Sequence, residues 1–232
     1  MKLIPALLFG GMLAVSGWAQ NGEYEPYSAE LVKKAQAGDA SAQLHLGWCY
    51  EDGNGVTQDY KEAVKWFTKS AEQGDTVAQS NLGLCYYLGK IVPQDYEGAV
   101  KWLSKSAEQG EANGQRLLGI CYSYGLGVTQ DKKEAVKWYT KSAKQGNAYA
   151  QLDLGNCYYL GAGVEKDYKE ALKWFTKSAE QGDAEAQFEV GFQYLIGKAV
   201  TQDKKEAVKW YTKAAEQGDE RAKKAIEELK SK

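Results

Sequence analysis

Few side chains in this sequence could do chemistry, and they do not form a recognisable catalytic set. Among the 232 residues there is one histidine, His45, and four cysteines. A Ser–His–acid triad would have to use His45. No serine is followed three residues later by a lysine, as a Ser-x-x-Lys nucleophile requires. We therefore expect no catalytic residue, no metal or cofactor site, and no enzymatic activity.

The charge balance excludes a further class of function. Lys and Arg total 29 and Asp and Glu total 31, which leaves a net charge of −2. Nucleic-acid-binding proteins usually carry a basic excess, so we expect no nucleic-acid partner. With 44% hydrophobic and 26% charged residues, the composition is that of a folded protein.

The first residues have the pattern of a secretory signal peptide. One lysine precedes an apolar stretch over 3–15, and Gly17 and Ala19 provide small residues before a cleavage point near Gln20. We expect residues 1–19 to be removed and the protein to be secreted or periplasmic, without stable membrane insertion. Retention of this segment as an anchor is the alternative.

The chain contains a 36-residue repeat, and the helices of this repeat must position the remaining side chains. The segments AVKWFTKSAEQG (63–74), AVKWLSKSAEQG (99–110), AVKWYTKSAKQG (135–146), ALKWFTKSAEQG (171–182) and AVKWYTKAAEQG (207–218) are near copies. Five units follow: 39–74, 75–110, 111–146, 147–182 and 183–218. Residues 20–38 form an N-terminal segment with a capping helix, and residues 219–232 form a polar C-terminal capping helix.

Each unit predicts two helices and a short loop. In the first unit, Asp39 caps the first helix, which ends at Gly53 in a left-handed conformation. Asp59 begins the second helix and, with Glu62, forms a variant of the capping box. No unit can bury its apolar face alone, so the units stack into an all-α, right-handed superhelical solenoid.

The repeat resembles the Sel1-like family, related to the tetratricopeptide repeats. The resemblance depends on the pattern A-x-x-x-LG-x-x-Y-x-x-G-x-GV-x-x-D-x-x-x-A-x-x-W-x-x-x-A-x-x-G and covers 39–218. It implies a scaffold or adaptor that assembles protein complexes. Some cysteine-rich relatives have a disulfide in each unit and are associated with β-lactamase activity. Their cysteine pair would fall at Ala71 and Gln79, where this sequence has none.

Comparison of the five units separates the columns that hold the fold from those that vary. The fixed columns include Trp66, Trp102, Trp138, Trp174 and Trp210, which we expect to be core residues. The variable first-helix columns form a second stripe, expected to line a concave groove rich in aromatic residues. We select as partner-binding residues Trp48, Leu84, Tyr87, Arg116, Ile120, Tyr124, Tyr149, Asn156, Tyr159, Phe188 and Phe192, and we expect the column of Trp48 to point outward most.

Two other repeated columns have simpler explanations. Cys49, Cys85, Cys121 and Cys157 recur every 36 residues, too far apart on stacked helices for disulfides, so we expect buried thiols. Unpaired thiols are unusual in exported proteins and count against export. Lys61, Lys65 and Lys69 recur in later units and lie near glutamates at helical spacing, which indicates a solvated outer face.

We therefore predict a monomeric, exported, non-enzymatic scaffold that binds a protein or peptide segment in this groove. One alternative is a secreted β-lactamase-like or peptidoglycan- or glycan-binding protein of the cysteine-rich type. Another is a cytoplasmic or membrane-tethered adaptor.

Overall fold

The structure, a computed structural model, describes residues 25–89 and 91–231, and this part of the chain is all-α. It divides into two compact units, residues 1–69 and 70–232, each described by itself below. The predicted all-α repeat fold is confirmed. The predicted signal peptide lies outside the described residues.

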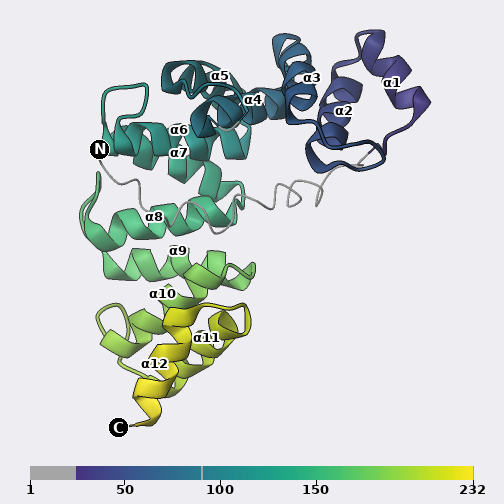
Figure 1. The fold of residues 1–232 in the computed structure, drawn as a ribbon. Coiled ribbons are helices and arrows are strands. Elements are labelled where there is room, and N and C mark those ends of the chain that lie inside the picture. Colours follow the sequence, from purple (N-terminus) through teal and green to yellow (C-terminus); the bar gives the residue numbers. More distant parts are fainter. Residues whose placement is uncertain (1–24, 90, 232) are drawn as a thin grey trace. The chain divides into compact units, whose positions relative to one another are not determined.

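Twelve helices make up the described part (Figure 1). Their bounds are α1 Ala29–Gln36, α2 Ala40–Asp52, α3 Tyr60–Glu72, α4 Thr76–Leu88, α5 Tyr96–Glu108, α6 Ala112–Tyr124, α7 Lys132–Lys144, α8 Ala148–Leu160, α9 Tyr168–Glu180, α10 Ala184–Ile196, α11 Lys204–Glu216 and α12 Glu220–Lys230. In the second unit the helices pack in chain order, the first helix of each repeat against its own second helix and the second against the next repeat.

The ends of the first helices match the prediction. The Asp39 carboxylate accepts a hydrogen bond from the Ala42 amide at 2.7 Å, and Gly53 ends α2 with φ of 69°. A left-handed conformation costs little for glycine and much for other residues. The repeated glycine at this position therefore fixes where each first helix stops.

The predicted capping box is only half formed. The Asp59 carboxylate accepts hydrogen bonds from the backbone amides of Lys61 and Glu62. The Asp59 amide, however, donates to the Tyr50 carbonyl at 2.9 Å, and the Glu62 side chain pairs with Lys65. The predicted reciprocal hydrogen bond from the Asp59 amide to Glu62 is therefore wrong. The short loop brings this amide to the Tyr50 carbonyl at the end of α2, which accepts its hydrogen bond instead.

Buried glutamines connect successive repeats, a feature the sequence analysis did not use. In the second unit the Gln115 amide nitrogen donates to the Ala107 carbonyl of the preceding repeat at 3.1 Å, and its oxygen accepts from Gln145 of its own repeat at 2.8 Å. Equivalent pairs join Gln79 to Gln109, Gln151 to Gln181, and Gln187 to Gln217. Because each amide is bonded on both sides, the ladder fixes the register between repeats.

The most deeply buried column of large side chains is the one that follows the tryptophans by one residue. Phe67, Leu103, Tyr139, Phe175 and Tyr211 are at most 4% exposed. Each faces a glycine of its repeat's first helix: a Cβ built on Gly155 would lie 2.5 Å from the Phe175 ring. The first helix therefore needs glycine there so that the two helices can approach closely.

The tryptophan column only partly fits the predicted core. Trp66 and Trp174 are buried, whereas Trp102, Trp138 and Trp210 are partly exposed. A lysine one turn later covers each ring, as where the Lys141 ammonium lies 3.8 Å from the Trp138 ring centre. The core prediction is therefore right for two tryptophans and wrong for three: the helices leave those three rings partly exposed, and a lysine stem covers them as it does the buried two.

The remaining lysines behave as predicted. Lys137, Lys173 and Lys209 each pair with a glutamate three residues earlier on the same helix, at 2.6 to 2.8 Å. These exposed pairs contribute little stability. Each pair neutralises one lysine of its helix.

Candidate functional site

The structure divides the predicted partner-binding residues into three groups. Tyr124 and Tyr149 are exposed, at 48% and 45%. Partly buried are Trp48, Leu84, Arg116, Asn156, Tyr159, Phe188 and Phe192. Tyr87 and Ile120 are buried, at 6% and 1% exposure. Trp48 belongs to the first unit, and all the others belong to the second.

Tyr87 and Ile120 cannot contact a partner as predicted. The first helices α4 and α6 pack against each other as well as against their second helices. Burial raises the pKa of Tyr87, and Cys121 and Tyr124 on α6 raise it further, while its ring lies 5.7 Å from that of Tyr96. The packing of α4 against α5 and α6 covers Tyr87, and Ile120 is buried within the same packed helices, so the prediction for these two residues is wrong.

The outermost column is also different from the one expected. The column of Trp48 is partly or fully buried in the repeats, whereas the last first-helix position holds Tyr124 and Leu160, the latter 64% exposed. The sequence analysis missed Leu160 as a site residue. Its position as the final residue of α8, where no further turn can cover it, was the available signal.

The exposed tyrosines belong to one cluster with a buried ion pair. The Arg116 Nε atom on α6 donates to the Asp153 carboxylate on α8 at 2.7 Å, with both side chains largely buried. The Arg116 guanidinium lies 5.2 Å from the centre of the Tyr149 ring. Burial raises the pKa of Tyr124, and the Asp153 carboxylate raises it further. We call Arg116, Tyr124, Tyr149 and Asp153 the tyrosine cluster.

This arrangement holds the ring of Tyr149 in place without burying it. A guanidinium facing an aromatic ring is attractive, and the bond to Asp153 restricts its motion. Tyrosine offers a large contact area and a hydroxyl that can bond across an interface. Restricting such a side chain before binding lowers the entropy lost on association. The tyrosine cluster therefore has the properties of an anchor for a protein ligand.

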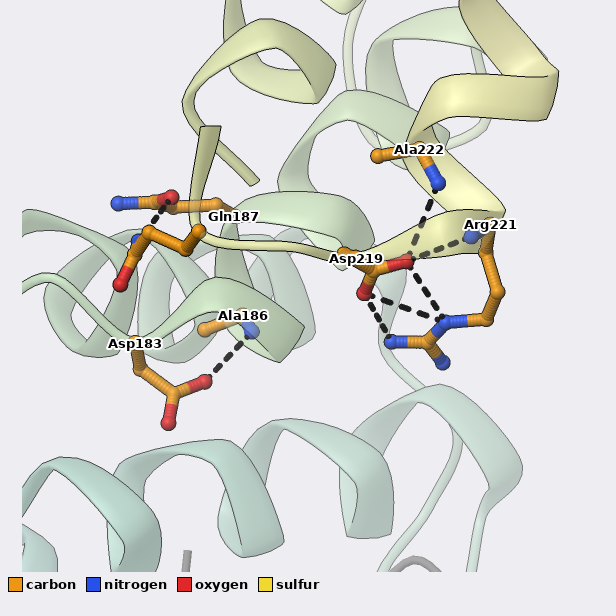
Figure 2. A network of polar contacts seen from close by, with 7 residues as sticks. Asp183, Ala186, Gln187, Asp219, Arg221 and Ala222 are labelled. Carbon is orange, nitrogen blue, oxygen red and sulfur yellow. Dashed lines mark hydrogen bonds and ion pairs between the residues drawn. The ribbon is translucent and has the colours of Figure 1, made fainter. Parts of the chain in front are cut away.

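Three acidic side chains lie on the repeat that follows Tyr149 and Asp153. Asp183, Glu185 and Glu189, which we call the acid set, begin or belong to α10. Burial raises the pKa of all three, and the Asp153 carboxylate raises that of Asp183 and Glu185 further. Figure 2 shows Asp183 capping α10, its carboxylate accepting from the Ala186 amide at 2.7 Å. The sequence analysis noted these acids only as part of a negative excess.

Figure 2 also shows the ion pair of Arg221, an arginine whose charge acts on Glu185 and Glu189. Arg221 on α12 pairs with Asp219 at 2.7 Å, and the Asp219 carboxylate also caps α12 (Figure 2). The Arg221 guanidinium lies 4.4 Å from the Phe188 ring centre. Burial raises the pKa of Glu189 to about 7, and Arg221 opposes that rise only in part.

The raised pKa of Glu189 predicts how stability depends on pH. Its folded pKa lies above the usual unfolded value of about 4.3. The stabilising contribution is therefore complete below about pH 4 and is lost as the pH rises through about 7. We expect Glu189→Gln, which cannot ionise, to raise the thermal unfolding midpoint at pH 8 and to change it little at pH 4.5.

Circular dichroism melts at the two pH values check this prediction. Glu180→Gln, at an exposed position on α9, is the matched control and should show no such pH dependence. Equal shifts for Glu189→Gln at both pH values would contradict it.

The other aromatic residues of this face contribute to packing. The rings of Tyr159 and Phe192 meet edge to face, with centres 6.5 Å apart. Phe188 lies against Tyr211, at 5.3 Å. These three residues therefore connect neighbouring helices, and only part of each ring faces outward.

The cysteines are buried as thiols, as predicted. Burial raises the pKa of Cys121 and of Cys157 to about 12. The thiolate is the reactive form, so we expect neither residue to react with iodoacetamide at pH 8 until the chain is unfolded in guanidinium. Mass spectrometry of alkylated peptides measures this directly. Modification of Cys121 or Cys157 in the native protein would contradict the burial.

The described residues contain neither a candidate metal site nor a candidate membrane-spanning helix. Within residues 25–89 and 91–231, no group of three or more histidine, cysteine, aspartate or glutamate side chains is placed to hold a metal ion. No helix of the same ranges has the length and apolar character needed to cross a bilayer.

Comparison with known proteins places the repeats in a family context. The family model described as the Sel1 repeat matches residues 40–75, 76–111, 112–147, 148–183 and 184–219. These boundaries lie one residue after those predicted from the sequence, and each match begins at the first residue of a first helix.

Solved structures give the same result over longer stretches. The chain is similar to c5321, a protective antigen of uropathogenic Escherichia coli with an SLR fold, with 41% identity and a TM-score of 0.76 over 86% of this chain and 43% of that one. It is also similar to a Sel1 repeat protein from Oxalobacter formigenes, with 36% identity and a TM-score of 0.75 over 80% of this chain and 76% of that one.

One curated protein matches over about a single repeat. The secretory immunoglobulin A-binding protein EsiB of Escherichia coli O6:H1 is 47% identical over 38 residues, which are 16% of this chain and 8% of EsiB. The chain thus spans less than half the length of c5321 and matches only a small part of EsiB.

Proposed function

Because this chain belongs to the Sel1-repeat family, whose members mediate protein–protein interactions, we propose that it is a non-enzymatic adaptor that binds a protein segment on the first-helix face of its second unit. The face consists of the outward residues of α6, α8 and α10. The tyrosine cluster is its centre.

One observation carries this proposal. Tyr124 and Tyr149 are about half exposed, yet a largely buried ion pair restrains the ring of Tyr149 and influences the hydroxyl of Tyr124. The helix packing does not require such an arrangement, since the equivalent positions in other repeats hold different side chains. Exposed tyrosines with a restrained ring, as at Tyr149, are typical of residues that dominate binding energy in interfaces.

The pattern at residues 1–19 supports export of this adaptor. One positive charge, an apolar stretch and small residues before Gln20 are the parts of a signal peptide. Sequencing the N-terminus of protein purified from its native host tests this. A mature start near Gln20 is expected, and an intact Met1 in the folded, soluble pool would contradict export.

Affinity capture from the native host tests the binding surface. Full-length wild-type protein is compared with the double variant Tyr124→Ala/Tyr149→Ala and with Tyr60→Ala. Tyr60 is an appropriate control because it is equally exposed, at 45%, but belongs to a second helix, α3. Partners retained by wild type and Tyr60→Ala and lost by the double variant would support the proposal. Equal retention by all three would contradict it.

A β-lactamase-like activity is not favoured by any arrangement seen here. A nitrocefin assay on the purified protein is the direct check. Turnover abolished by a single serine substitution would replace the adaptor proposal.

A further inference from the structure

We propose that the partner presents a lysine or arginine side chain to Glu185 and Glu189 on α10 while its apolar side chains contact the tyrosine cluster. This inference rests on the proposed function, since it specifies the chemistry of the partner for the same face.

The first argument is the distribution of charge among the first helices of the second unit. Helix α4 has no charged residue, α6 has only Arg116, α8 has only Asp153, and α10 has Glu185 and Glu189. Arg116 and Asp153 neutralise each other in their ion pair. The charge left on α4 to α10 is therefore negative and located on α10. Helix α12 follows with Arg221 in the column of Glu185, and Arg221 forms its ion pair with Asp219.

The second argument is that no salt bridge among the described residues reaches these two glutamates, although the charge of Arg221 acts on both. Arg221 forms its ion pair with Asp219, and no salt bridge among the described residues joins it to Glu185 or Glu189. Lys137, Lys173 and Lys209 are bound to glutamates of their own second helices. The two carboxylates on α10 thus lack a direct cationic partner in this part of the molecule.

The third argument comes from the surroundings of these carboxylates. Glu185 and Glu189 are both partly buried, beside the aromatic ring of Phe188 on the same helix. Burial raises the pKa of both groups, which means that their charged forms are poorly compensated. A partner cation would supply the missing compensation, whereas a partner carboxylate would add repulsion, so this position selects for sign.

The nearby aromatic residues define what accompanies the cation. Tyr149 precedes the acid set by one repeat, in the same column as Glu185, and Tyr124 is at the far end of α6. An occupant that reaches from the acid set to both tyrosines must therefore be longer than one side chain. We infer an extended or helical peptide segment with one basic residue among apolar ones.

Selection from a random twelve-residue peptide library displayed on phage tests the inference with a defined probe. The full chain is immobilised at pH 8, where glutamates are largely ionised. Selected peptides that depend on the tyrosine cluster are those that bind wild type and fail to bind the immobilised Tyr124→Ala/Tyr149→Ala variant. We expect these peptides to be enriched in lysine or arginine together with aromatic or aliphatic residues.

Affinity measurements on the most enriched peptide then assign the basic residue to α10. Fluorescence anisotropy should show about a tenfold or greater loss of affinity for Glu185→Gln/Glu189→Gln. The control Glu180→Gln/Glu216→Gln removes the same charge from exposed second-helix positions and should bind as wild type does. Replacing the peptide's basic residue by glutamine should weaken wild type and leave the α10 double variant unchanged.

The outcomes separate this inference from the proposed function. Cluster-dependent peptides without basic residues, or equal affinity for the α10 double variant, would overturn the cationic partner and leave the adaptor surface intact. Failure to select any cluster-dependent peptide would overturn the surface itself, and the inference with it.

Discussion

Truncating Phe175 to alanine is expected to lower the free energy of unfolding by about 3–5 kcal/mol. The side chain is fully buried in a cluster with Leu152, Ala179 and Val190, and it lies against the backbone of α8 at Gly155. Its removal would leave a cavity between three helices that rigid packing cannot close. Because each repeat is stabilised by its neighbours, α8 to α10 should loosen together.

Trp138→Ala is the informative comparison for this variant. The sequence predicted the tryptophan column as the core, whereas Trp138 is partly exposed beneath Lys141. Urea denaturation followed by circular dichroism should therefore show a smaller loss for Trp138→Ala than for Phe175→Ala. Equal losses would restore the tryptophan column as the deepest layer of the fold.

The largest effect on function is expected from the tyrosine cluster. Tyr149→Ala should weaken partner binding by about 2 kcal/mol, or roughly 30-fold, if Tyr149 is an anchor of the interface. The unfolding midpoint should change little, because the ring is 45% exposed. Tyr124→Ala should act in the same direction. Loss of stability without selective loss of binding would identify both rings as packing residues.

The repeat made most of the fold predictable from sequence. Five copies of one 36-residue pattern fix the helix ends, because Asp39 and Gly53 have equivalents with the same physical roles in every unit. The buried cysteines were predictable for the same reason, since stacked helices keep equivalent positions apart. Internal repetition thus supplied the comparison that a single sequence normally lacks.

The exposure of the variable stripe depends on neighbouring helices and could not be predicted from the sequence. A helical stripe says which residues share a face, but not how far the next helix covers it. Tyr87 in the last turn of α4 and Ile120 in α6 are buried, whereas Tyr124 and Leu160, the final residues of α6 and α8, are exposed. Variability alone therefore overestimated the accessible surface of the stripe.

The tyrosine cluster was half visible in the sequence for a similar reason. Arg116, Tyr124 and Tyr149 were identified as separate variable residues, and Asp153 only as one acid among several. Their association requires knowing that the side chain of Arg116 reaches across one repeat to Asp153. Such pairs arise from side-chain reach and helix spacing together, and the repeat pattern specifies only the spacing.

We propose that the tyrosine cluster binds the partner and is not needed for folding. The decisive measurement is isothermal titration of the captured partner into wild type, Tyr124→Ala/Tyr149→Ala and Tyr60→Ala, with thermal melts of the same samples. We expect three similar melting temperatures, and an affinity loss confined to the Tyr124/Tyr149 variant. An unchanged affinity for that variant at an unchanged melting temperature would contradict it.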